Sequence, residues 1–225
     1  MNQQEKSALS KTRILYAALQ EFSEKGYGGA ALNAVWAREG ISKGSIYHHF
    51  KDKDELYLLC VENCFTSITA YLRKAAEASY QTLVEGLQGY FDARLHFFSE
   101  KPEYLGIFVD ASFNPPKKLL PQILRLRQDF DELNVSVLTR LLKTEPLRPG
   151  LSVETAAEDF RMYMDYFNAH FKAVCGEQLS PRELLYAHEE RCHRQLDIFL
   201  YGVLGEKTVH RKEPGICAGA QNPGD

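Results

Sequence analysis

Two adjacent histidines, His48 and His49, are the residues of this sequence whose type and position most invite a chemical role. Imidazole is a common metal ligand and the side chain that most readily exchanges protons near neutral pH. The pair lies in the segment ISKGSIYHHFKDKDELY (41–57), between a tyrosine and a phenylalanine and shortly after a Ser-Lys-Gly-Ser run. Whether these histidines hold a metal, act as bases or do something else depends on the element that carries them.

Helical geometry argues against a metal centre and against catalysis at this pair. Neighbouring residues of a helix point about 100° apart, so the two imidazoles would not naturally chelate one ion. A general base needs a nucleophile or a partner acid in a pocket, and a surface helix that carries Lys43 and Ser45 provides no evident cleft. We therefore expect no metal, no cofactor and no enzymatic activity.

Helical spacing of apolar residues runs through almost all of the sequence, and no stretch shows a sustained period of two. Ile14, Ala18 and Phe22 recur at four-residue intervals, and Asp52 followed by Glu55 has the spacing of a capping box. The pattern predicts an all-α fold of about nine helices, the first of which ends at Gly26. The predicted helices span about 10–25, 32–39, 42–50, 52–78, 81–100, 102–113, 117–143, 152–174 and 181–202.

The predicted helices at 32–39 and 42–50 form a helix-turn-helix arrangement, whose second member enters the major groove of DNA. The turn between them contains a glycine, and Ser42 offers its hydroxyl as the N-cap of the second helix. Ile46 and Phe50, four residues apart, give that helix an inward-facing stripe. The residues that project outward from it are Lys43, Gly44, Ser45, Tyr47 and His48.

The stretch GYGGAALNAVWAREGISKGSIYHHFKDKDELY (26–57) resembles the DNA-binding signature of the tetracycline-repressor (TetR-type) transcriptional regulators. The shared features are the Gly-Ile-Ser turn, the Tyr-x-His-Phe end of the recognition helix and the Phe-x-x-Lys-x-x-Leu entry to the next helix. The resemblance covers roughly residues 11–60. It implies a DNA-binding regulator that is a homodimer, binds double-stranded operator DNA, and acts as a repressor released by a small-molecule effector.

The sequence departs from this signature at a few positions. Ala30 and Ala31 stand where the family usually has threonines, and Glu21 occupies a position in the first helix that is commonly apolar. The missing threonines remove a phosphate contact and an N-cap at the helix predicted over 32–39. Asn33 lies close enough in the sequence to replace part of that function.

The resemblance assigns His48 to the base edges and His49 to the backbone phosphates. The alternative that both are merely solvated, or packed on the first helix, stays open. Lys53 would disfavour the start of its helix electrostatically, but it suits a phosphate that shares the same amides. The predicted DNA-binding residues are Asn33, Ser42, Lys43, Gly44, Ser45, Tyr47, His48, His49 and Lys53.

We predict a helix-turn-helix domain at 1–52, a helical effector-binding and dimerisation domain at 53–204, and a disordered tail at 205–225 that is rich in glycine, proline and polar residues. The last two helices carry apolar stripes that include Phe167 and Leu196. Such stripes are usually core faces, but they also resemble the family's two-fold dimer interface. A dimer would place two recognition helices about 34–36 Å apart, as one face of DNA requires.

Aromatic and polar residues are mixed in the helices predicted between 81 and 174, which is typical either of an aromatic-rich core or of a ligand pocket. Arg94 could pair with Asp110 or with an acidic ligand, and the pattern does not decide between them. The effector is expected to be small and largely apolar, with an aromatic or acidic end. The predicted ligand-binding residues are Tyr90, Arg94, Phe98, Phe108, Asp110, Phe113, Tyr163 and Phe167.

Composition excludes several classes of protein. A length of 225 residues with 44% apolar side chains fits one ordinary domain or two small ones. The net charge of −3 provides no general basic surface, so DNA contact must depend on a few placed groups. The sequence shows no membrane span and no signal-peptide block, and its five cysteines form no C-x-x-C pair, so we expect a cytoplasmic protein with reduced thiols. The alternative to a regulator is an all-α enzyme or a non-DNA adaptor that retains the fold.

Overall fold

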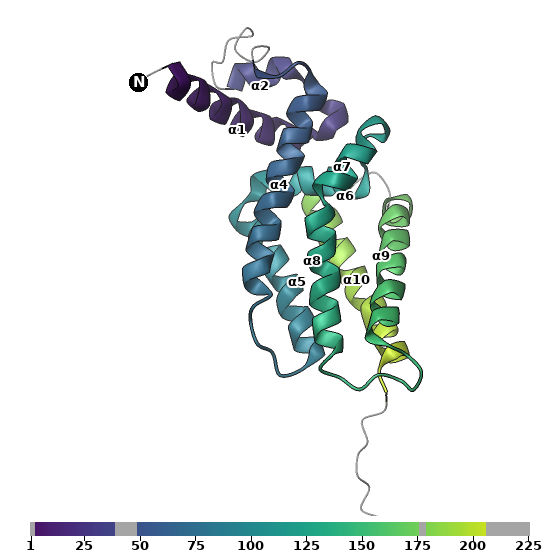
Figure 1. Ribbon diagram of the computed structural model, residues 1–225. Coiled ribbons are helices and arrows are strands. Elements are labelled where there is room, and N and C mark those ends of the chain that lie inside the picture. Colours follow the sequence, from purple (N-terminus) through teal and green to yellow (C-terminus); the bar gives the residue numbers. More distant parts are fainter. Residues whose placement is uncertain (1–2, 39–48, 176–178, 206–225) are drawn as a thin grey trace, which may run out of the picture.

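The computed structural model describes residues 3–38, 49–175 and 179–205, and the regular elements in these ranges are all helices. The predicted all-α fold is therefore confirmed. The helices are α1 (Gln3–Gly29), α2 (Leu32–Arg38), α4 (Lys53–Ala75), α5 (Leu83–Glu100), α6 (Leu105–Phe113), α7 (Leu120–Leu126), α8 (Gln128–Leu142), α9 (Val153–Cys175) and α10 (Pro181–Val203) (Figure 1). Short 3₁₀ turns at Pro102–Tyr104 and Lys117–Leu119 precede α6 and α7.

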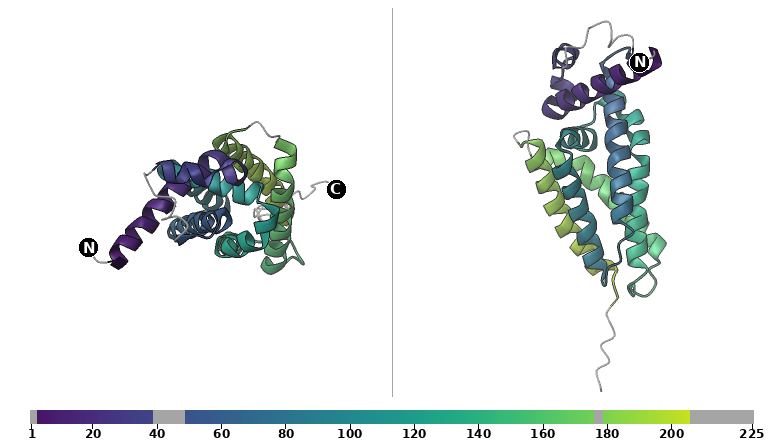
Figure 2. Two further views of the ribbon diagram at one scale, coloured as in Figure 1. Left: turned by 90° about the horizontal axis from the view of Figure 1, so that it is seen from above. Right: turned by 90° about the vertical axis from the view of Figure 1, so that its left-hand side faces the viewer.

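The long helices α4, α5, α8, α9 and α10 run along the molecule as a bundle, and α1 and α2 lie across one end of α4 (Figure 1). Helix α6 lies across the bundle below α1, as the second view of Figure 2 shows, and it contacts α1, α4, α9 and α10. The sequence predicts a domain boundary between residues 52 and 53. Helix α4 follows this boundary and contacts α1, which precedes it, so the boundary stays a prediction. None of the helices in the described ranges combines the length and the apolar character needed to cross a membrane.

The first helix is longer than the sequence pattern predicts. It begins at Gln3, whereas the pattern predicted a start near Ser10, and it reaches Gly29 only across a non-helical residue at Gly26, where the first helix was predicted to end. Gly26 has φ of +63°, a left-handed conformation that glycine adopts without steric cost, so the chain kinks there and resumes a helical turn. The apolar period alone does not reveal that a turn of helix follows the kink.

The single helix predicted over 117–143 is wrong, because the chain forms the 3₁₀ turn at Lys117–Leu119 and then two helices, α7 and α8. The break lies at Arg127, whose φ and ψ are −94° and −2°. Arg127 donates from Nε to Asp131 Oδ2 at 2.8 Å, and its guanidinium carbon lies 6.0 Å from the ring centroid of Phe65 in α4. Packing against another helix therefore fixes a bend that no glycine or proline marks at this point of the sequence.

The capping box predicted at the start of α4 is confirmed. The Asp52 side chain accepts a hydrogen bond from the Glu55 amide at 2.9 Å, and the Glu55 carboxylate accepts one from the Lys51 amide at 2.7 Å. Helix α4 buries Cys60 and Cys64 completely. Burial raises the pKa of both thiols, so they remain protonated at neutral pH and serve as packing residues.

A buried carboxylate, Glu21, joins α1 to α2. Its side chain is 0% exposed, and it pairs with Lys25 Nζ at 3.0 Å and with an Arg38 guanidinium nitrogen at 3.2 Å. The Ala31 amide, at the start of α2, donates to Glu21 Oε1 at 3.2 Å. Glu21 therefore satisfies the amide of the residue that precedes α2. The side chain of Asn33, which was predicted to supply part of the cap of this helix, is exposed.

We predict that Glu21→Gln lowers the free energy of unfolding by about 1–3 kcal/mol, because it weakens hydrogen bonds made to a buried charged group. The matched control is Glu24→Gln, since Glu24 also contacts Arg38 but has a side chain that is 56% exposed. The control should cost less than about 0.5 kcal/mol. Urea denaturation monitored by circular dichroism measures both, and equal losses would contradict the assigned role of Glu21.

The effect of Glu21 should also depend on pH. Burial opposes its ionisation, but Lys25, the Ala31 amide and Arg38 outweigh burial and hold its pKa below the ordinary 4.5. A lowered pKa in the folded state stabilises the fold above the unfolded-state value and loses that contribution as pH falls through the folded value. The difference between the wild type and Glu21→Gln should therefore shrink below about pH 4.5.

Candidate functional site

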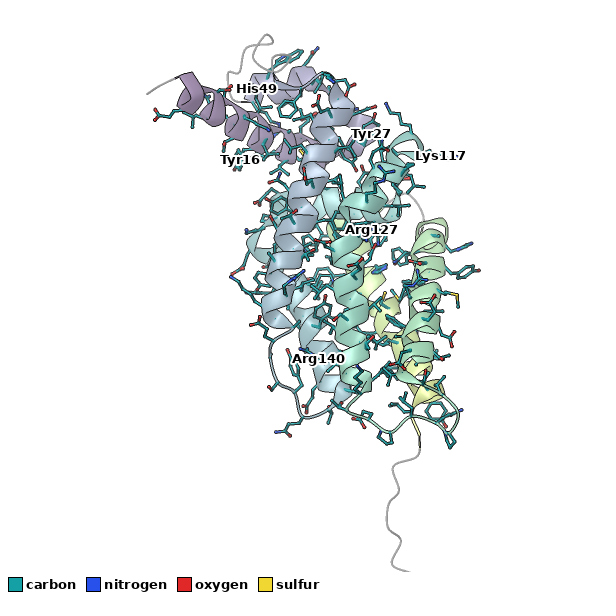
Figure 3. All side chains as sticks on the ribbon, in the orientation of Figure 1. Tyr16, Tyr27, His49, Lys117, Arg127 and Arg140 are labelled. Atoms are coloured by element: carbon teal, nitrogen blue, oxygen red, sulfur yellow. The ribbon has the colours of Figure 1, made fainter. Side chains whose placement is uncertain are left out.

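The predicted DNA-binding residues divide into those inside and those outside the described ranges. Asn33 is exposed on α2, and His49 is half-buried with its ring centroid 6.4 Å from that of Phe50. Figure 3 shows His49 at the same end of the molecule as α1 and α2. Six residues lie outside the described residues, and their roles stay predictions: Ser42, Lys43, Gly44, Ser45, Tyr47 and His48.

Lys53, the first residue of α4, lies over an aromatic ring. Its Nζ is 4.7 Å from the ring centroid of Tyr27, and Lys118 Nζ is 5.5 Å from the same centroid. The Tyr27 hydroxyl donates to Asp54 at 2.5 Å. Burial lowers the pKa of Lys53, and the neighbouring Asp54 opposes that shift. Figure 3 shows Tyr27 and Lys117 at this end of the bundle. Two lysines, Lys53 and Lys118, therefore lie over one ring near the start of α4.

A cavity of about 100 Å³ opens within the bundle, between α5, α6, α8 and α9, with His188 of α10 in its wall. It is large enough for several water molecules or a small organic molecule. Arg127, labelled in Figure 3 at the upper end of α8, belongs to its polar lining. The aromatic residues in its wall are Tyr90, Phe91, Phe108, Phe113, Phe130 and Phe160.

The structure brings together half of the predicted ligand-binding residues. The four that line the cavity are Tyr90, Arg94, Phe108 and Phe113. Phe98 lies in the core against Phe108, at 4.9 Å between ring centroids. The Tyr163 hydroxyl donates to Gln195 at 2.7 Å, and Phe167 packs against Phe171 and His188.

Sequence reasoning missed the polar lining from α8 and α9. Asp131, Asn134, Arg161 and Asp165 all line the cavity. An available signal was the Arg-x-x-x-Asp spacing at 127/131 and at 161/165, which places opposite charges on one helix face.

Arg94 forms a buried ion pair with Glu189 of α10, at 3.3 Å, and not with Asp110. The alternative of an Arg94–Asp110 pair is therefore wrong. Glu189 Oε1 also lies 3.5 Å from His188 Nδ1. Burial opposes the ionisation of Glu189, but Arg94 and His188 outweigh it and lower its pKa. Burial also lowers the pKa of His188, which favours the neutral imidazole at pH 7.

Asp110 lies outside the cavity lining, at the junction of α1, α4 and α6. Its Oδ2 accepts hydrogen bonds from the Tyr27 amide at 2.8 Å and from the Tyr57 hydroxyl at 2.9 Å. One turn earlier, the Gly106 amide donates to Ser23 Oγ at 3.1 Å. Helix α6 therefore holds α1 and α4 through one set of residues, while its other residues form part of the cavity wall.

Known proteins resemble this chain both in its N-terminal segment and along most of its length. Residues 14–60 match the family model described as "Bacterial regulatory proteins, tetR family". The chain is 28% identical over 169 residues to the biofilm operon icaADBC HTH-type negative transcriptional regulator IcaR of Staphylococcus epidermidis, covering 74% of this chain and 87% of that protein. It is also 28% identical over 196 residues to IcaR of Staphylococcus aureus strain Newman, covering 84% of this chain and 98% of that protein.

Solved structures show the same fold. The fatty acid degradation regulator FadR from Bacillus halodurans superposes with a TM-score of 0.56 at 15% identity, covering 81% of this chain and 97% of that one. The matched N-terminal segment, the similarity to transcriptional regulators along most of the chain and the shared fold agree with one another. Residues 14–60 are therefore a TetR-type DNA-binding segment, and the chain is similar along most of its length to a transcriptional regulator.

Proposed function

We propose that this chain is a ligand-responsive repressor that acts in the cytoplasm. A homodimer would bind operator DNA through the predicted recognition helix, and a small, largely apolar effector in the cavity would release it. IcaR, a relative along most of the chain, is named a negative transcriptional regulator, which supports repression. The same relationship favours a regulator over the alternative of an all-α enzyme or a non-DNA adaptor.

The observation that carries this proposal is the double role of α6. Phe108, Ser112 and Phe113 line the cavity, whereas Gly106 and Asp110 contact α1 and α4. A ligand that fits one position of α6 better than another shifts the protein toward that position. Because Asp110 is hydrogen-bonded to the Tyr27 amide and the Tyr57 hydroxyl, such a shift would move α1 and α4, and the helix-turn-helix with them.

The outer face of the last two helices supports a dimer. In α9, Met162 and Tyr166 are one turn apart and exposed, and in α10 Ile198 is 62% exposed and Tyr201 84% exposed. Several large exposed apolar side chains on two helices that contact each other favour an interface there. Leu196 is only 5% exposed and belongs to the core, so its predicted place in the interface stripe is wrong.

The DNA-binding proposal predicts different effects for two kinds of residue. Tyr47→Ala and His48→Ala should each weaken operator binding by about 1–3 kcal/mol if these side chains reach base edges. Lys53→Ala should weaken binding to all DNA sequences alike and reduce its salt dependence.

Fluorescence anisotropy with an operator selected by genomic pull-down measures these affinities at several salt concentrations. Lys74→Ala is the matched control, because Lys74 is an exposed lysine in the last turn of the same helix as Lys53. It should leave operator affinity unchanged. Wild-type affinity in both recognition-helix variants, or a changed base preference in Lys53→Ala, would contradict the assigned roles.

The dimer proposal predicts that Ile198→Glu produces monomers at micromolar concentration. A charge placed in a two-fold interface is buried twice without a partner, and breaking such contacts costs several kcal/mol. Leu124→Glu in α7 is the control, since Leu124 is 51% exposed and its helix packs against α4 and α8. Light scattering decides the outcome. A wild-type protein that is already monomeric would refute the proposal.

The proposed coupling through α6 predicts that Tyr57→Phe weakens communication between the cavity and DNA. The variant removes one hydrogen bond to Asp110, at 2.9 Å, and keeps the buried ring. Loss of about 1 kcal/mol should reduce the ratio of effector affinities with and without operator severalfold.

Calorimetry with a compound that co-purifies with the protein measures this ratio. Tyr104→Phe is the control, because its hydroxyl contacts Ser67 at 3.4 Å and not Asp110. An unchanged ratio in Tyr57→Phe would exclude this hydrogen bond from the coupling.

A further inference from the structure

Two polar atoms in the cavity wall are buried without a hydrogen-bond partner. Arg94 is only 7% exposed and its Nε–H has no acceptor, and the Ser112 hydroxyl is also unpaired. Leaving a buried donor unpaired costs free energy, so such atoms require an explanation. Because Arg94 and Ser112 both line the cavity, a ligand placed there can supply what they lack.

Two other polar pairs in the wall are satisfied by the protein itself. The Tyr90 hydroxyl donates to Asn134 Oδ1 at 2.9 Å, and His188 Nε2 lies 2.8 Å from Asn168 Oδ1. These pairs do not need a ligand. The requirement for a hydrogen-bond acceptor is therefore concentrated at Arg94 and Ser112.

The positive charges of the wall are also compensated within the protein. Each lining arginine has a carboxylate partner: Arg94 pairs with Glu189 at 3.3 Å, Arg127 with Asp131 at 2.8 Å, and Arg161 with Glu158 at 2.6 Å. A ligand anion would enter a site with no uncompensated cation and would lose its hydration there. A neutral acceptor meets the Arg94 Nε–H without that cost.

We propose that the cavity binds a small neutral molecule with an apolar, aromatic-sized body and one carbonyl-type oxygen, which accepts hydrogen bonds from Arg94 Nε and Ser112 Oγ. The aromatic wall of Phe91, Phe108, Phe113 and Phe130 holds the apolar body. The regulatory meaning of this ligand class rests on the proposed function, whereas its binding is a property of the cavity alone.

Three compounds of similar shape test the proposal with the full chain in the absence of DNA. Acetophenone carries the neutral carbonyl, isopropylbenzene has the same branched shape without oxygen, and benzoate carries a negative charge. We expect acetophenone to bind roughly tenfold more tightly than either of the others, since its oxygen completes hydrogen bonds to buried donors. Ligand-observed NMR titration measures affinities down to the millimolar range.

Substitutions in the cavity wall test where the carbonyl oxygen of acetophenone binds. Ser112→Ala should reduce the advantage of acetophenone over isopropylbenzene severalfold, and the double variant Arg94→Met with Glu189→Gln should nearly abolish it without leaving a buried unpaired charge. Thr69→Val is the matched control, because the Thr69 hydroxyl in α4 is likewise buried and unpartnered but does not line the cavity. It should leave all three affinities unchanged.

Other outcomes overturn the proposal. Tightest binding of benzoate would make the cavity an anion site, and equal binding of acetophenone and isopropylbenzene would remove the polar contact. The absence of binding by all three compounds at millimolar concentration would reject this ligand class. None of these results affects DNA binding by the ligand-free protein, which an operator gel shift measures separately. Failure of the proposed ligand class is therefore distinguishable from failure of the proposed function.

Discussion

The Asp110 carboxylate is the interaction on which the arrangement of the other parts depends. It accepts hydrogen bonds from the Tyr27 amide just beyond the kink of α1 and from the Tyr57 hydroxyl in the first turns of α4. The left-handed Gly26 makes room for it, since a Cβ there would lie 3.3 Å from Asp110 Oδ1. Three helices that are far apart in the sequence therefore meet at one charged group. The orientation of the N-terminal helices relative to the bundle is fixed by polar contacts as well as by apolar packing.

The parts of the fold that could be predicted from the sequence depend on local patterns. Apolar spacing locates most helices, and the Asp52–Glu55 capping box requires only residues three positions apart. The pairing of Arg94 with Glu189 could not be predicted, because the partners belong to α5 and α10 and no periodicity relates them. The bend at Arg127 escaped prediction for the same reason, since it depends on a contact with Phe65 of α4.

The candidate site shows the same division between local pattern and tertiary contact. Aromatic richness favoured Tyr90, Phe108 and Phe113, which line the cavity, but it could not separate them from Phe98, which packs against Phe108 and does not line it. The sequence predicts Asp110 as a ligand-binding residue, but its carboxylate lies outside the cavity lining, on the side of α6 that contacts Tyr27 and Tyr57. A polar residue in an apolar helix thus indicates a buried partner without identifying it.

The close contact of Gly106 with α1 limits how this protein can diverge. A Cβ at this position would lie 1.9 Å from the Ser23 carbonyl oxygen, a backbone atom that cannot rotate away. Any larger residue must therefore separate α6 from α1. In a two-fold assembly α6 would be displaced from α1 in both subunits. The distance between the two N-terminal helix-turn-helix segments would then reflect both displacements. A single codon in the middle of the chain would then alter which half-site spacing the protein can recognise, without any change to a residue that touches DNA.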